Sequence, residues 1–222
     1  MLFTHPELEE LIDTEEPFFH TLVIENPSFF RRFLLDISAQ IAGSDGRAVL
    51  SIRDKPVDFS KNAEILDSFL PFEVNRKTLL TKICSSLEKN AASPEHYRAT
   101  MEMLSGLEAY LADLCFDFPC DIVFPKLNAG TLLKTAGPEL RCDGDCLSEQ
   151  LLDYMELVTA FDRQKLFITV NLRSYMEDGE FALFAGSVLS HGFPVLAVEN
   201  REYVRADCER RIVVDSDLCE IS

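Results

Sequence analysis

Apolar runs and one amphipathic segment alternate in the last third of the chain. The amphipathic segment, 178–190, places Phe181, Phe184 and Val188 on one helical face. Continuous apolar strands on either side of such a helix are typical of parallel strands that are covered on both faces. We therefore predict an α/β fold with a parallel-type sheet. The apolar runs are 166–170, 193–198 and 211–215.

The first third of the chain shows the same alternation. Residues 18–25 read as a first strand that ends before Asn26 and Pro27, a favourable N-cap and first residue for a helix. Residues 48–52 read as a further strand, and 63–70 are ambiguous between helix and strand. The helix after Pro27 is expected to end near Gly43. Its expected buried face consists of Phe30, Phe33, Leu34, Ile37 and Ile41.

The middle of the chain has a helical period instead. Stripes of apolar residues begin after Arg76, after Ser93-Pro94 and before Gly137-Pro138, and a last stripe is capped near Ser148. We therefore predict a discontinuous α/β head domain of residues 1–75 and 160–222, with an inserted α-helical leg of residues 76–159.

Parallel sheets commonly bind ligands at the carboxyl ends of their strands. The chain contains no GxxxxGK[ST] and no GxGxxG loop that would hold a phosphate. The frame thus resembles a P-loop NTPase core without the phosphate loop, which favours binding over catalysis. No HExxH pair and no GxSxG elbow is present. We predict that the protein is not an enzyme, and a degenerate hydrolase remains the rival interpretation.

The net charge of −17 argues against nucleic acid as a partner when it is taken alone. It leaves room for a local basic patch, or for divalent cations on acidic clusters. It also supports an alternative role as an acidic protein–protein scaffold. The chain has no apolar run of membrane-spanning length, and acidic residues stand where a signal peptide needs bases. Together with seven cysteines, this indicates a reduced, cytoplasmic protein.

Two groups of side chains could bind a metal. Cys115, Cys120, Cys142 and Cys146 have spacings outside the tight zinc knuckle, and free cysteine is commonly a small buried residue. Carboxylates around the leg are more suggestive, because hard oxygen ligands on loops suit calcium or magnesium. Most acidic clusters are nevertheless only solvated faces. The candidate calcium ligands are Asp117, Asp121, Asp143, Asp145 and Glu149.

Basic side chains are sparse, and they gather in two places. One set surrounds the strand at 48–52, and the other brackets the short helix before Gly137. Either set could face a phosphate backbone, although surface solubility explains any single residue as well. The candidate DNA-binding residues are Arg47, Arg53, Lys55 and Lys61 in the first set, with Lys126 and Lys134 in the second.

Several segments, in this order, carry a resemblance to a known family. The chain resembles the Csn accessory adaptation protein of CRISPR subtype II-A systems, and the resemblance covers almost the whole chain. Two departures are a sparser acidic string at 116–121 and an apparent insertion at 127–131. The segments that carry the resemblance are Thr21–Glu25, Phe72–Asn75 with the helix that begins at Thr78, Lys165–Asn171 and Val195–Tyr203.

The resemblance implies a function that the composition does not. Members of that family form a ring-shaped homotetramer whose basic central hole threads onto free ends of double-stranded DNA. Calcium in the leg region steadies the ring, and the role is spacer acquisition together with other adaptation proteins and the effector nuclease. The resemblance therefore implies non-enzymatic, sequence-independent DNA-end binding, with calcium as a cofactor.

Overall fold

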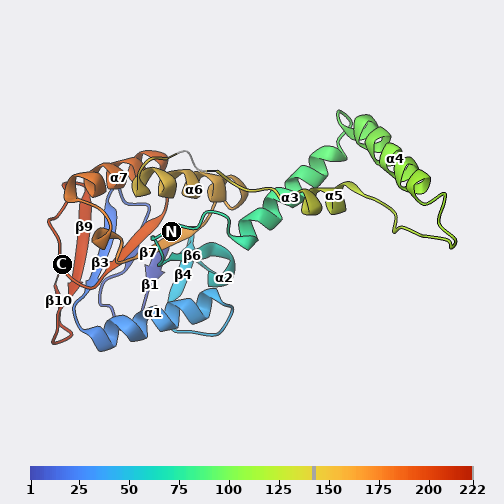
Figure 1. The fold of residues 1–222 in the computed structure, drawn as a ribbon. Helices are drawn as coiled ribbons and strands as arrows, with labels where there is room; N and C mark the ends of the chain where they lie inside the picture. The colour runs from blue at the N-terminus through green and yellow to red at the C-terminus, as the bar shows by residue number, and fades with distance from the viewer. Residues whose placement is uncertain (142–143, 222) are drawn as a thin grey trace. The chain divides into compact units, whose positions relative to one another are not determined.

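The computed structural model describes residues 1–141 and 144–221 (Figure 1). It divides into two compact units. The first unit contains residues 1–73 and the described residues from 144 onward, and the second is Val74–Arg141. Each unit has its own secondary structure and is described by itself.

The first unit is built on a six-stranded sheet of order β10-β9-β3-β8-β7-β6. The five strands from β9 to β6 run parallel, and β10 pairs with β9 in the antiparallel sense. Every residue of β3, β7 and β8 is buried, which confirms the prediction of parallel strands covered on both faces. The strands are β3 (Phe19–Ile24), β6 (Ala63–Leu66), β7 (Leu166–Val170), β8 (Val195–Glu199), β9 (Glu209–Val214) and β10 (Glu220–Ile221).

Helices cover the two faces of this sheet (Figure 1). Helix α1 (Pro27–Ile41) packs in one cluster with Leu22 and Ile24 of β3. Helices α6 (Leu147–Phe161) and α7 (Asp178–His191) lie on the opposite face, where Phe181 meets Phe19 edge to face at 5.2 Å. The faces are distinct because successive strand residues point to opposite sides of a sheet.

Helix α1 begins and ends as predicted but is rotated about its axis relative to the prediction. Its buried residues are Phe29, Phe33, Ile37 and Gln40, whereas Phe30, Leu34 and Ile41 are only partly buried. Both stripes have helical spacing, so periodicity alone could not choose between them. Gln40 can be buried because its side-chain amide both donates a hydrogen bond to Ala48 and accepts one from it.

A second, antiparallel sheet in this unit has the order β2-β1-β4-β5. The predicted strand at 48–52 belongs to this sheet and not to the parallel one. Its neighbours were missed because two or three residues are too short for a periodic signal. The strands of this sheet are β1 (Leu2–Thr4), β2 (Ile12–Asp13), β4 (Val49–Ile52) and β5 (Lys55–Val57). The short helix α2 (Phe59–Asn62) follows β5.

The second unit consists of three helices, α3 (Lys77–Ala91), α4 (Tyr97–Leu114) and α5 (Ala129–Ala136). Helix α5 ends at Gly137 with φ of 64°, a left-handed position that favours glycine. The side chain of Asn75 ties the two ends of the unit together. It donates to the Leu140 carbonyl at 3.2 Å and accepts from the Leu140 amide at 2.7 Å.

The second unit ends earlier in the chain than the predicted helical leg, at Arg141. The predicted helical leg included 142–159, whereas α6 clusters with the first unit. The reason is the burial of Leu151, Tyr154 and Met155, which pack with the sheet-bearing unit. Within the described part of the chain, no helix is both long enough and apolar enough to cross a lipid bilayer.

Candidate nucleic-acid interface

The hairpin of β4 and β5 presents two cations at its tip. Ile52 pairs with Lys55, so Arg53 and Asp54 form a two-residue loop, and both have positive φ, 50° and 59°. Such a loop matches the twist of a hairpin, but it usually contains asparagine or glycine. A non-glycine residue in this conformation is strained by about 1 kcal/mol, and strained residues gather at functional sites. The tip thus combines the predicted phosphate contacts Arg53 and Lys55 with the exposed carboxylate of Asp54.

Arg53 and Lys55 are both exposed, and neither makes an ion pair with any residue that the structure describes. Their charges are thus free to attract an anion. Arg47, which precedes β4, differs in this respect. Its guanidinium lies 3.1 Å from both Glu7 and Asp36, and these contacts raise the pKa of Arg47.

Lys61 is also partly neutralised. Its ammonium lies 3.7 Å from Asp58, and the hydrogen bonds from Ser60 lower the pKa of that carboxylate and so keep it charged. Of the four candidate cations in the first unit, the structure therefore singles out Arg53 and Lys55 as unpaired.

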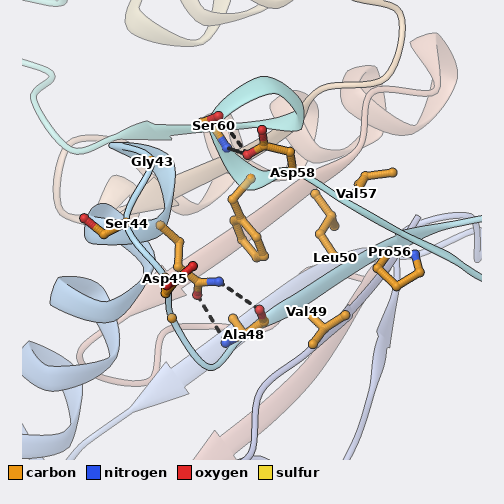
Figure 2. A pocket seen from close by; sticks show the side chains of 13 residues that line it. Gly43, Ser44, Asp45, Ala48, Val49, Leu50, Pro56, Val57, Asp58 and Ser60 are labelled. Carbon is orange, nitrogen blue, oxygen red and sulfur yellow. Dashed lines mark hydrogen bonds between the residues drawn. The ribbon is translucent and has the colours of Figure 1, made fainter.

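A pocket of about 480 Å³ lies beside this hairpin (Figure 2). Val49, Leu50 and Val57 contribute apolar walls, and the charged side chains in its lining are Asp45 and Asp58. A pocket with carboxylates at its edge repels phosphate, so we place no phosphate contact inside it.

The buried amide of Gln40 forms part of this pocket. It donates to the Ala48 carbonyl at 2.9 Å and accepts from the Ala48 amide at 3.1 Å, the two dashed bonds at Ala48 in Figure 2. This pairing imitates a neighbouring strand. It fixes the residue that leads into β4 to the end of α1.

The two predicted cations of the second unit, Lys126 and Lys134, are both exposed. Lys134 shares a hollow of about 460 Å³ between α3 and α5 with Lys77, a cation that was not among the predicted contacts. Helices α3 and α5 approach closely at Gly130, where an added Cβ would come within 2.6 Å of the Glu88 carboxylate. These atoms are the flexible end of the Glu88 side chain, so a larger residue at position 130 would require that side chain to move aside.

The candidate calcium ligands are divided between the two units. Asp117 and Asp121 are exposed in the segment after α4, and Asp145 and Glu149 are exposed at the start of α6. The Glu149 carboxylate accepts a hydrogen bond from the Asp145 amide at 2.9 Å. Asp143 lies outside the described residues.

No group of three or more histidine, cysteine or acidic side chains that could hold a metal ion is present among the residues that the structure describes. Asp143 and Cys142, one candidate ligand from each group, lie outside the described residues, so calcium and zinc binding stay predictions. We derive no step through a metal.

A buried charge cluster lies at the carboxyl end of β8. Glu199 is 1% exposed, and its Oε1 accepts a hydrogen bond at 3.1 Å from the amide of Arg173 in the short 3-10 helix η1 (Leu172–Ser174). Its Oε2 has no hydrogen-bond partner among the described residues. Burial raises the pKa of Glu199 to about 7, against the opposing effect of Arg173. Glu199 is therefore a carboxyl group that is partly protonated at neutral pH.

The side chain of Arg173 connects the elements at the carboxyl end of β8. Its guanidinium is buried, donates to the carbonyl of Val204 at 3.0 Å, and lies 3.8 Å from the buried carboxylate of Glu209. It also lies over the ring of Phe181 at 4.0 Å and over that of Tyr203 at 5.0 Å. The segment after β8 is thereby fixed to η1, α7 and β9.

Arg211 completes the cluster from β9. It pairs with Glu209 at 2.8 Å and donates to the carbonyl of Tyr203 at 2.9 Å. The Glu-x-Arg-Glu-Tyr signature of residues 199–203 therefore supplies internal contacts, a role that its resemblance to the family did not predict. A buried glutamate directly after an apolar strand was the available signal for such a role.

The fold, a largely parallel α/β sheet with a separate antiparallel sheet and a helical unit, defines a mixed α/β protein. Two of its exposed cations without a described ion pair, Arg53 and Lys55, lie on the β4–β5 hairpin. A family model described as CRISPR-associated protein (Cas_Csn2) matches residues 40–218. The chain belongs to this family, the type II-A adaptation proteins, and its role lies in CRISPR adaptation. A search of curated proteins found no significant match.

Proposed function

We propose that the protein binds ends of double-stranded DNA, independently of sequence, through the hole of a homotetrameric ring during spacer acquisition. The observation that carries the proposal is membership of the Cas_Csn2 family, whose role is adaptation. The exposed, unpaired cations Arg53 and Lys55 support it, because phosphate contacts need free positive charge. Symmetry would bring four copies of these two residues around one hole, which would make the hole locally basic although each chain has a net charge of −17.

The proposed mechanism breaks no bond. A duplex inside the ring is held by cations that contact the phosphate backbone, which carries no direct sequence information. Free ends are required because a closed ring must be threaded. The proposed setting is the cytoplasm, with other adaptation proteins and the effector nuclease as partners.

We further propose that the parallel sheet is a P-loop NTPase frame that has lost its phosphate site. In that frame a phosphate binds at the N-terminus of the helix after a central strand. Here Asn26 stands at that position and accepts hydrogen bonds from Ser28 and Phe29, at 3.1 and 3.0 Å. The helix terminus is therefore capped by its own chain, which supports a non-enzymatic role.

The first prediction concerns the topology of the DNA. Linear duplex should shift in a gel in proportion to its ends, and covalently closed circles of the same sequence should not. The measurement is run with calcium and with a chelator, because calcium binding stays a prediction. Light scattering on the same sample should give about 100 kDa, four times the 25.1 kDa chain.

Each contrary result identifies a different alternative. Equal binding of linear and closed DNA would exclude threading. A missing shift at every calcium concentration would favour the acidic scaffold, and turnover of nucleotide or DNA would favour a hydrolase.

The second prediction tests the hairpin. The double variant Arg53→Ala/Lys55→Ala should weaken binding of all sequences equally and flatten the dependence of affinity on salt, by about one unit of the log–log slope for each phosphate that the variant no longer neutralises. The matched control is Arg47→Ala/Lys61→Ala, which removes the same number of charges from residues that are already paired. If both variants change the slope equally, the hairpin is not the contact face.

A further inference from the structure

Several buried polar atoms of the first unit have no hydrogen-bond partner among the described residues, and four of them belong to neighbouring elements. They are Thr21 Oγ1 in β3, Thr169 Oγ1 in β7, Glu199 Oε2 in β8 and Arg173 Nε in η1. Each of these residues is at most 3% exposed. A buried polar atom without a partner costs free energy, so folded proteins pair such atoms with protein groups or with ordered water.

The register of the parallel strands places three of these atoms on one face of the sheet. Thr21 and Thr169 both pair with Ala197, the residue of β8 that lies between them. Paired residues of neighbouring strands point to the same face, and so does Glu199, two residues after Ala197. Nε2 of His20 also has no partner among the described residues, but it lies on the opposite face because His20 directly precedes Thr21.

The face that carries these atoms is the one covered by helix α7. Phe19, two residues before Thr21 in β3, meets Phe181 of α7 edge to face at 5.2 Å. The guanidinium of Arg173 lies 4.0 Å from the centroid of the same Phe181 ring, and the Arg173 amide donates to Oε1 of Glu199 at 3.1 Å. Nε of Arg173 is therefore on the same side of the sheet as Oε2 of Glu199.

The two hydroxyl groups are too far apart to bond to each other. Neighbouring strands are about 4.8 Å apart, so the Cα atoms of Thr21 and Thr169, with one strand between them, are about 10 Å apart. Ala197, which lies between them, contributes only a methyl group to this face. Water can bridge polar groups at such a separation.

We propose that this face of the first unit binds ordered water, which bonds to Thr21 Oγ1, Thr169 Oγ1, Glu199 Oε2 and Arg173 Nε. A buried water molecule typically makes about three hydrogen bonds, and these four atoms can supply them. Nε of Arg173 can only donate, whereas the hydroxyls can donate and accept. Water suits both protonation states of Glu199, because it donates to a carboxylate and accepts from a carboxylic acid. The proposal does not depend on DNA-end binding.

The charges around the site favour water over an ion. Arg173 places a fixed positive charge beside Glu199, and Arg211 places a second one beside Thr21 in the register. Both cations repel a metal ion, and Glu199 repels an anion. A neutral ligand that both donates and accepts hydrogen bonds fits this set of groups.

The direct test is a crystal structure of the full-length protein at a resolution that shows ordered water. We expect density within hydrogen-bond distance of Glu199 Oε2 and of at least one of the two threonine hydroxyls. Density with oxygen contacts of about 2.4 Å would indicate a metal ion and overturn the proposal. A well-ordered site with no such density would also overturn it.

The test in solution is Thr169→Val, which keeps the shape of the side chain and removes its hydroxyl. A hydroxyl that bonds to water stabilises the fold, so the variant should unfold at a lower urea concentration than the parent. The matched reference is Thr14→Val, because the Thr14 hydroxyl donates to the Met1 carbonyl at 3.2 Å. Both midpoints should fall. An unchanged or higher midpoint for Thr169→Val would show that its hydroxyl is unbonded and would overturn the proposal.

The double variant Thr21→Val/Thr169→Val tests whether water links the two hydroxyls. Substitutions about 10 Å apart that share no protein partner normally have additive effects on the free energy of unfolding. We expect the double variant to lose less than the sum of the two single losses, because the first substitution already disturbs the shared water. Thr14→Val/Thr169→Val is the control and should be additive.

Additive losses in Thr21→Val/Thr169→Val would show that no water is shared between the strands and would overturn the linked site. Circular dichroism verifies that each variant keeps its secondary structure. DNA-end binding is not a readout of these experiments, so failure of the ring and failure of the water site are separate results.

Discussion

Arg173→Ala should lower the free energy of unfolding by about 3 kcal/mol, the lower end of the range for breaking a buried ion pair. The loss arises because Glu209, which is 2% exposed, keeps its charge with one cation fewer. The value lies at the lower end because Arg211 still pairs with Glu209 at 2.8 Å. The substitution also removes the contacts of the guanidinium with Phe181 and Tyr203.

Urea denaturation followed by circular dichroism measures this loss. The matched control is Arg201→Ala, which removes an exposed guanidinium that lies over Tyr203 at 4.7 Å. The control should cost less than about 1 kcal/mol. Similar midpoints for Arg173→Ala and the parent would show that the buried cluster does not stabilise the fold.

Glu199→Gln should change how stability depends on pH. Burial raises the pKa of Glu199 from 4.5 to about 7, so the folded state binds one proton more than the unfolded state between these values. Stability from this group is present below about pH 4.5 and is lost as the pH rises to about 7. The full effect is about 3 kcal/mol, from about 1.4 kcal/mol for each unit of pKa.

The measurement is the difference in unfolding free energy between the variant and the parent at several pH values. Glutamine does not titrate, so the variant should gain stability relative to the parent between pH 4.5 and 7. Contributions from His5 and His20, whose pKa values are lowered chiefly by burial, are common to both proteins and cancel. Glu202→Gln, at an exposed carboxylate, is the control for the effect of a Glu-to-Gln change itself.

The sequence was sufficient to predict the elements that are long and uniformly apolar. The strands β3, β7 and β8 follow from their apolar runs, because strands buried on both faces are mostly apolar, and the helix α7 follows from its period. The antiparallel sheet was not predicted, since β1, β2 and β5 are two or three residues long. Their pairing depends on contacts that are distant in sequence.

The candidate interface was predictable only as a set of cations near one strand. Which of them are neutralised depends on Glu7 and Asp36, which lie far from Arg47 in the sequence. The buried role of Arg173 was not predicted either. An arginine in a polar segment after a strand reads as exposed until the fold places Glu209 beside it.

The pairing of Gln40 with Ala48 has a mechanical consequence for the hairpin. A single side chain clamps the strand that carries Arg53 to the C-terminal turn of a core helix, and Gly46 leaves the room that this clamp needs, because a Cβ there would come within 2.2 Å of Gln40. The hairpin that carries the charged tip is therefore fixed to the hydrophobic core through Ala48 and Leu50. Loss of the Gln40–Ala48 hydrogen bonds would therefore make the position of the Arg53 side chain less well defined, although its charge would remain.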